Sequence, residues 1–118
     1  MVPLNDVADA ALNRDSLRLR GLTQTLIRES PRLSDVPRPV TSDDRHLVTA
    51  AAIVELLAAR TGQPAPAWTA KVGGLSEPFF LVVEAETMTH LRTMCEQESP
   101  EPLRKRRLLA PPEFLSWA

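Results

Sequence analysis

Apolar residues dominate one stretch near the middle of the chain. Between residues 47 and 59 only Thr49 and Glu55 are polar, so a helix formed by this stretch is apolar on two faces. Such a helix has to be covered on both sides by the rest of the protein. The pattern therefore predicts a central helix over residues 42–61, around which the other elements pack.

The two ends of this predicted helix carry start and stop signals. Thr41 and Asp44 have the spacing of a capping box, in which a hydroxyl and a carboxylate accept hydrogen bonds from free backbone N–H groups of the first turn. Gly62 follows the apolar stretch and suits the left-handed backbone conformation that ends many helices.

Two shorter amphipathic patterns precede the central helix. Apolar residues three and four positions apart predict helices over residues 4–12 and 15–29, which form an N-terminal helical hairpin within residues 1–30. Gly21 weakens the second helix by about 1 kcal/mol relative to alanine. A glycine kept at this cost indicates close packing against a neighbouring element.

A proline-rich connector joins the hairpin to the central helix. Residues 31–41 contain three prolines and too few apolar residues for an element of their own. We expect an extended segment that Leu33 and Val36 hold against the helices.

The apolar run FFLVV at residues 79–83 has the composition of a strand. No second strand is evident in the sequence, and an isolated strand leaves its backbone N–H and C=O groups unpaired. We therefore favour an extended apolar plug that leads into a helix, with a strand as the alternative.

A further amphipathic pattern predicts a helix over residues 84–98, which Pro100 ends. Its inward face is expected to carry Met88, Leu91 and Cys95. Its solvent face is expected to carry Glu84, Glu86, Glu96 and Glu98.

The end of the sequence is hydrophobic, with Phe114, Leu115 and Trp117 close together. A chain end of this kind is rarely left free in water, so it docks either on its own domain or on a partner. Eleven prolines cut the chain into short pieces. Together the patterns predict one helical domain over residues 1–118, an all-α, irregular, proline-segmented bundle of about five helices, with the central and C-terminal helices in residues 42–118.

Composition argues against several classes of function. The net charge of −1 gives no bulk attraction to nucleic acid or membrane, and four glycines form no phosphate-binding loop. We expect Cys95 to be a small core residue and His46 and His90 to be surface or boundary residues, so no metal and no cofactor is predicted. The apolar run is too short to span a bilayer and no signal peptide is evident, which predicts a cytoplasmic protein. With no catalytic motif, we expect a binding protein and not an enzyme.

Charge is unevenly distributed in the C-terminal half. Six glutamates and one arginine lie between residues 77 and 101, and residues 104–107 are then all basic. These charges form either solvated faces or a dipolar surface that steers a partner. Acid–base catalysis by the glutamates is a third interpretation, but no cleft or polar partner gives a reason for a shifted pKa. Four basic residues without an aromatic among them are only a weak signal for nucleic acid.

Three stretches carry a resemblance to known proteins: residues 36–68 with the motif GxPxPAW, residues 77–82 with a phenylalanine pair, and residues 98–118 with the motif ESPxxLRxR. Over residues 36–118 the chain resembles small bacterial proteins that accompany nucleotidyltransferase-type toxins. It also resembles the C-terminal region of some actinobacterial helix-turn-helix regulators, although it lacks an N-terminal DNA-binding domain of that kind.

The resemblance implies an antitoxin-like protein that binds and silences a cognate nucleotidyltransferase-type toxin. The alternative is a small DNA-associated transcriptional regulator that uses the basic residues 104–107, and a homo-oligomer is left open in either case. An acidic helix complements the basic site that such a toxin needs for triphosphate and nucleic acid. The predicted partner-binding residues are Glu84, Glu86, Glu96, Glu98, Arg104, Arg106, Arg107, Phe114, Leu115 and Trp117.

Overall fold

The computed structural model describes residues 2–116, and the predicted anchor Trp117 lies outside this range. Within residues 2–116, α- and 3₁₀ helices account for 57% of the residues and strands for 3%, which confirms the expected all-α class with five α-helices in this range. None of the helices in residues 2–116 combines the length and the apolar character that a membrane span needs. In chain order the elements are α1 (Leu4–Leu12), α2 (Ser16–Glu29), the 3₁₀ helix η1 (Leu33–Asp35), α3 (Asp44–Arg60), η2 (Ala67–Lys71), β1 (Phe79–Phe80), η3 (Val83–Glu86), α4 (Thr89–Glu98), α5 (Glu101–Arg104) and β2 (Leu108–Leu109).

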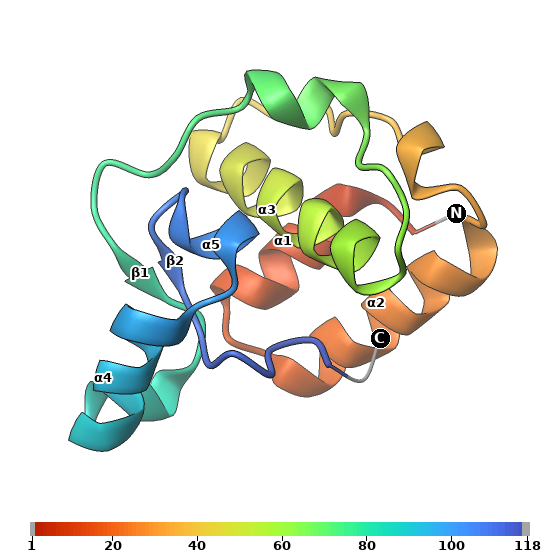
Figure 1. Cartoon of the computed structure of the whole chain (residues 1–118). Helices are drawn as coiled ribbons and strands as arrows, with labels where there is room; N and C mark the ends of the chain where they lie inside the picture. Colours follow the sequence, from red (N-terminus) through yellow and green to blue (C-terminus); the bar gives the residue numbers. More distant parts are fainter. Residues whose placement is uncertain (1, 117–118) are drawn as a thin grey trace.

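Helix α3 lies at the centre of the molecule, as its two apolar faces predict (Figure 1). Ten of its residues are buried, and α1, η1, η2 and α5 all pack against it. Gly62 ends the helix with φ of 69°, the left-handed conformation expected from the sequence. The central position of this helix is confirmed.

The predicted capping box at the start of α3 is wrong, because the N-cap lies two residues after Thr41. Asp43 is the N-cap, and its carboxylate accepts hydrogen bonds from the backbone N–H groups of Arg45 and His46 at 2.9 and 3.4 Å. Thr41 acts one step earlier, because its hydroxyl accepts from the N–H of Asp43 at 3.1 Å. A carboxylate placed directly before the first turn is the stronger acceptor of the two.

Helices α1 and α2 form the predicted N-terminal hairpin. The carboxylate of Asp15 caps α2 by accepting from the N–H of Arg18 at 3.1 Å. The expectation of close packing at Gly21 is wrong, because a Cβ atom added there would meet no heavy atom within 4 Å. Gly21 lies on the exposed face of α2.

The proline-rich connector is held to the helical body as predicted. Leu33 and Val36 are buried. Two side chains that follow α3 in the sequence hold the connector's backbone: the amide oxygen of Gln63 accepts from Leu33 N at 3.0 Å, and the indole N–H of Trp68 donates to Val36 O at 2.9 Å. The connector forms the short helix η1, which the sequence did not predict, and is otherwise extended and fixed along the bundle.

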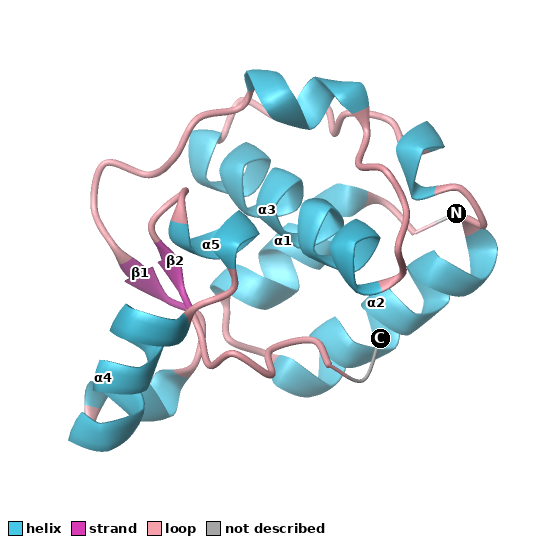
Figure 2. Cartoon of the chain, in the orientation of Figure 1, coloured by secondary structure: helices cyan, strands magenta, loops and turns pink. Residues whose placement is uncertain are grey.

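The favoured extended plug at residues 79–83 is replaced by a short strand. Phe79 and Phe80 pair in parallel with Leu108 and Leu109, which form the small sheet in Figure 2. The partner strand is only two residues long and follows a basic run, so its composition gave no warning of it. Pairing satisfies the backbone groups that would otherwise be exposed at an edge.

The predicted helix over residues 84–98 is broken into η3 and α4. Thr87 and Met88 separate the two pieces, and Thr89 begins the second without a side-chain cap. Thr87 in the break and Thr89 directly after it are both poor helix formers, which favours interruption at this point. Met88 is consequently 53% exposed and not inward, whereas Cys95 is buried as expected and Leu91 is half-buried.

Candidate functional site

The helices η3 and α4, residues 83–98, form a lobe that projects from the rest of the molecule. It extends away from the helical body, at the lower left of Figure 1. Helix α4 packs mainly against η3. A separate small cluster of Ala85, Cys95 and Leu109 forms the interior of this region. We call residues 83–98 the acidic lobe.

The four predicted acidic partner-binding residues all lie on this lobe and are exposed. Glu86 is within 2.6 Å of the guanidinium of Arg14. Among the described residues no ion pair involves the carboxylates of Glu84, Glu96 and Glu98. The lobe thus presents unneutralised negative charge to solvent, on an element that stands clear of the body.

Arg14 ties this lobe to the N-terminal hairpin. Besides the contact with Glu86, its Nε donates to Phe80 O at 3.0 Å, and its guanidinium carbon lies 5.0 Å from the centre of the Phe79 ring. Its backbone φ of 56° is unusual for a residue other than glycine. The sequence gave little indication of this role, because Arg14 lies in the short break between the two predicted N-terminal helices.

The basic cluster does not form the continuous surface that its sequence predicts. Arg106 is a correction to the predicted partner-binding set: its side chain is 3% exposed and pairs with Glu55 of α3. Lys105 approaches the same carboxylate at 3.1 Å. Arg104 and Arg107 are exposed, but they donate to the backbone carbonyls of Gln97 and Ser76 at 3.2 and 2.6 Å.

The pair of Arg106 and Glu55 changes the acidity of the carboxylate. Burial on its own raises the pKa of Glu55, but hydrogen bonds from Arg106, Thr69 and Lys105 and the charge of Arg106 outweigh burial and bring the pKa below its ordinary value. The sequence analysis did not predict a partner for Glu55, although a single charged residue in an otherwise apolar stretch is a signal that a basic partner is needed. The sequence did not identify which basic residue would supply it.

The predicted aromatic and aliphatic anchors at the end of the chain are used inside the fold. Phe114 is 7% exposed and Leu115 is fully buried, and both belong to the main core cluster. The alternative that this segment docks on its own domain therefore holds for both residues, and neither is available to anchor a partner. The prediction for Trp117 lies outside the described residues.

The single thiol and the two histidines show no arrangement for chemistry. Burial raises the pKa of the Cys95 thiol, and the neighbouring carboxylates Glu113 and Glu96 raise it further. His46 is half-buried, with ring nitrogens 3.6 and 3.0 Å from carboxylate oxygens of Asp9 and Asp43, and His90 is exposed. In residues 2–116 no group of three or more histidine, cysteine or acidic side chains is placed to hold a metal ion.

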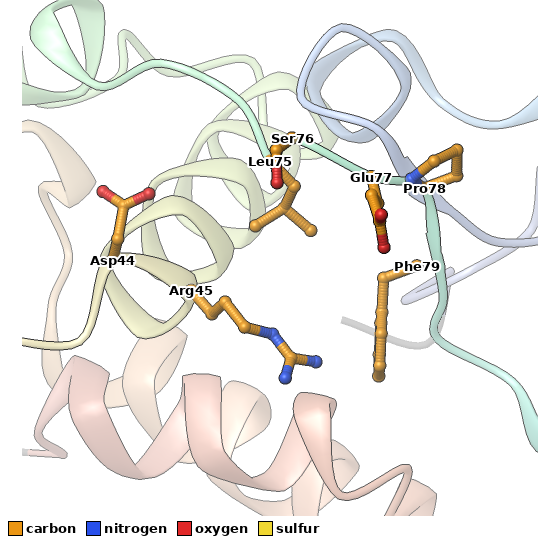
Figure 3. A pocket seen from close by; sticks show the side chains of 7 residues that line it. All are labelled: Asp44, Arg45, Leu75, Ser76, Glu77, Pro78 and Phe79. Atoms are coloured by element: carbon orange, nitrogen blue, oxygen red, sulfur yellow. The ribbon is translucent and has the colours of Figure 1, made fainter.

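A pocket of about 310 Å³ lies between the start of α3 and the segment that leads into β1 (Figure 3). Its charged side chains have mixed sign: Asp44 and Glu77 are acidic, and Arg45 is basic. The guanidinium of Arg45 turns toward Phe79 and lies 4.8 Å from the centre of that ring. This lining gives no preference for one sign of ligand charge, so the pocket does not define a function.

Comparison with known proteins adds no relative. No family model matches the chain, and no curated protein or solved structure is detectably similar to it.

Proposed function

We propose that the protein acts by binding and not by catalysis, as an antitoxin-like protein that neutralises a nucleotidyltransferase-type toxin through direct contact. The observation that carries this proposal is the acidic lobe. Glu84, Glu96 and Glu98 present exposed carboxylates without ion pairs among the described residues, on an element that projects from the body.

The chemistry of the partner favours this surface. A nucleotidyltransferase must attract a triphosphate and a nucleic acid, so its active site is basic. A projecting acidic element is complementary to such a site in charge and would steer the encounter of the two proteins. The resemblance of residues 36–118 to proteins that accompany these toxins supports the same conclusion. A toxin that consumes nucleoside triphosphates acts where they are made, so the proposal places the complex in the cytoplasm.

The alternative, a DNA-associated regulator, depends on the basic residues 104–107. Burial of Arg106 against Glu55 removes one cation from that surface, and Lys105 lies beside the same carboxylate. Phosphate contacts by free lysine and arginine side chains supply most of the affinity of proteins for duplex DNA. The acidic lobe therefore carries the better-supported proposal.

Co-expression with a nucleotidyltransferase encoded beside the gene for this chain tests the proposal. We expect the two proteins to co-purify and the toxicity of the nucleotidyltransferase to be relieved. Changing Glu84, Glu96 and Glu98 together to glutamine should lower the association rate by about tenfold at low salt and flatten its salt dependence.

A matched control removes three negative charges elsewhere on the surface. Asp6→Asn, Asp35→Asn and Glu77→Gln change exposed residues outside the lobe, so this triple variant should retain most of the association rate. Equal losses in both triple variants would show that only net charge matters. Tight, salt-sensitive binding to duplex DNA with no toxin partner would favour the regulator instead.

A further inference from the structure

A groove of about 240 Å³ lies where the junction of α1 and α2, the segment before η3 and the C-terminal segment meet. Figure 1 shows the C-terminal segment passing close to that junction. Leu19, Leu81 and Phe114 line the groove with side chains that are at least nine-tenths buried. Val83 also lines it and remains 50% exposed, which leaves an apolar surface open to solvent beside an apolar interior.

The size and lining of this groove suit one large apolar side chain. An apolar cavity of roughly 150 Å³ is enough to hold a benzene molecule. A groove of this volume therefore has room for a leucine or an aromatic side chain from another molecule. Residues of this kind, inserted in a pocket, supply much of the binding energy at protein interfaces.

The charges around the groove are predominantly negative. Asp15, Glu84 and Glu113 line it, and no ion pair among the described residues neutralises them. The Asp15 carboxylate also caps α2, so Glu84 and Glu113 are the acids left for a ligand. Arg14 is the one basic residue in the lining, and its guanidinium is already engaged by Glu86 and by the Phe80 carbonyl. A segment entering this groove would be favoured by lysine or arginine next to its apolar residue.

We infer that this groove is the anchor site for a protein partner, and that it accepts one leucine, phenylalanine or tryptophan flanked by basic residues. The inference rests on the proposed function and adds an apolar anchor site, which includes Val83 of the lobe, to the charged surface of the glutamates. Glu84 belongs to both surfaces, so a partner bound on the lobe can reach the groove without a gap. Because Phe114 forms part of the groove wall, the anchoring side chain comes from the partner and not from this chain.

Peptides provide a test that does not need the toxin. The probe is a ten-residue peptide with tryptophan and leucine at its centre and two lysines on each side, titrated into the full chain labelled with ¹⁵N. We expect amide shifts concentrated in residues 11–19, 81–84 and 113–114. A peptide with glutamate in place of lysine, and one with alanine in place of tryptophan and leucine, should each bind at least fivefold more weakly.

Variants of the protein assign the binding to the groove. Val83→Ser should weaken binding of the lysine-containing peptide by at least threefold. The double variant Glu84→Gln with Glu113→Gln should weaken it by at least the same factor. Val40→Ser is the matched control for the first, because Val40 is 94% exposed and lies elsewhere on the surface. Glu77→Gln with Glu101→Gln is the control for the second, since both acids are exposed and outside the groove.

The outcomes separate this inference from the proposed function. Shifts spread over the whole surface, or equal affinity for the lysine and glutamate peptides, would overturn the groove as an anchor site. A toxin that binds the Val83→Ser protein as tightly as the unchanged protein would also overturn it, while the proposed function would stand. Groove-directed peptide binding that Val83→Ser weakens would support the inference even if no nucleotidyltransferase partner is found.

Discussion

Arg106 and Glu55 meet as a guanidinium fork and a carboxylate although 51 residues of sequence separate them. Nη1 of Arg106 donates to Oε1 of Glu55, and Nη2 donates to Oε2 at 3.3 Å. The same Nη2 donates to the carbonyl of Thr69 at 2.9 Å. One side chain thus joins α3, η2 and the C-terminal part of the chain.

Removing either member of this pair should destabilise the protein strongly. Glu55→Leu leaves a buried guanidinium without its counter-ion, and Arg106→Met leaves a largely buried carboxylate with Lys105 alone. Each should lower the free energy of unfolding by about 3–5 kcal/mol, and the double variant should lose less than the sum of the two. Urea denaturation of all four proteins measures the coupling.

Arg18→Met is the matched control for Arg106→Met. Arg18 pairs with Asp9, but both side chains are more than two-fifths exposed. Exposed pairs contribute little to stability, so this change should lower the free energy of unfolding far less than Arg106→Met does. Equal costs for the two arginine variants would show that the buried pair has no special role in the fold.

The same pair predicts a dependence of stability on pH. The folded protein holds the pKa of Glu55 below its ordinary value. A carboxyl with a lowered folded pKa contributes stability above the unfolded pKa and loses that contribution as the pH falls through the folded pKa. Between pH 7 and pH 3, the melting temperatures of the unchanged protein and Glu55→Gln should therefore converge. A constant difference over this range would contradict the assignment.

Helix α3 shows what local sequence can predict. Its position follows from its own apolar periodicity, and so does the left-handed glycine at its end. The sequence does not define the N-cap of α3 as sharply, because Thr41 and Asp43 are both suitable acceptors within three residues. Asp43 took that role and Thr41 supports it from one step earlier.

Contacts between distant segments account for what the sequence did not predict. The pairing of Phe79 with Leu108 depends on where residues 99–107 place the second strand, which no local period encodes. The basic run offered several partners for Glu55, and only packing selected Arg106. The hydrophobic end of the chain likewise gave two docking possibilities, and the structure assigns Phe114 and Leu115 to the core.

Gly74 provides a test of close packing around Arg106. A Cβ atom added at Gly74 would lie 2.9 Å from the Cα atom of Arg106, whereas one added at Gly73 would meet no heavy atom within 4 Å. Gly74→Ala should therefore force a backbone shift and cost about 1–3 kcal/mol. Gly73→Ala should leave the stability within about 0.5 kcal/mol. Thermal denaturation of the two variants compares them directly, and identical melting temperatures would contradict the close approach.

Gly21→Ala should stabilise the protein, in contrast to Gly74→Ala. Gly21 is in the interior of α2, has no positive φ and has open space where a Cβ atom would be. Alanine at an exposed helical position should raise the free energy of unfolding by about 0.5–1 kcal/mol. A destabilised Gly21→Ala protein would instead support the close packing first expected from the sequence.

The acidic lobe should open at lower free energy than the helical body. Only Ala85 and Cys95 of the lobe are buried, in a small cluster with Leu109, whereas α3 is buried along most of its length. Regions with few buried apolar contacts open locally before the whole protein unfolds. Cys95 reports this opening, because its thiol must leave the cluster to react.

Thiol labelling in native buffer measures how much more readily the lobe opens than α3. The reference is a variant with Cys95→Ala and Ala51→Cys, which places the only thiol at a fully buried position of α3. Cys95 should react at least about tenfold faster than the thiol introduced by Ala51→Cys, and the two rates should become similar in denaturant. Equal rates in native buffer would mean that the lobe opens only with global unfolding. Under the proposed function, a lobe that opens on its own would let its glutamates adjust to the toxin while α3 keeps the rest of the fold in place.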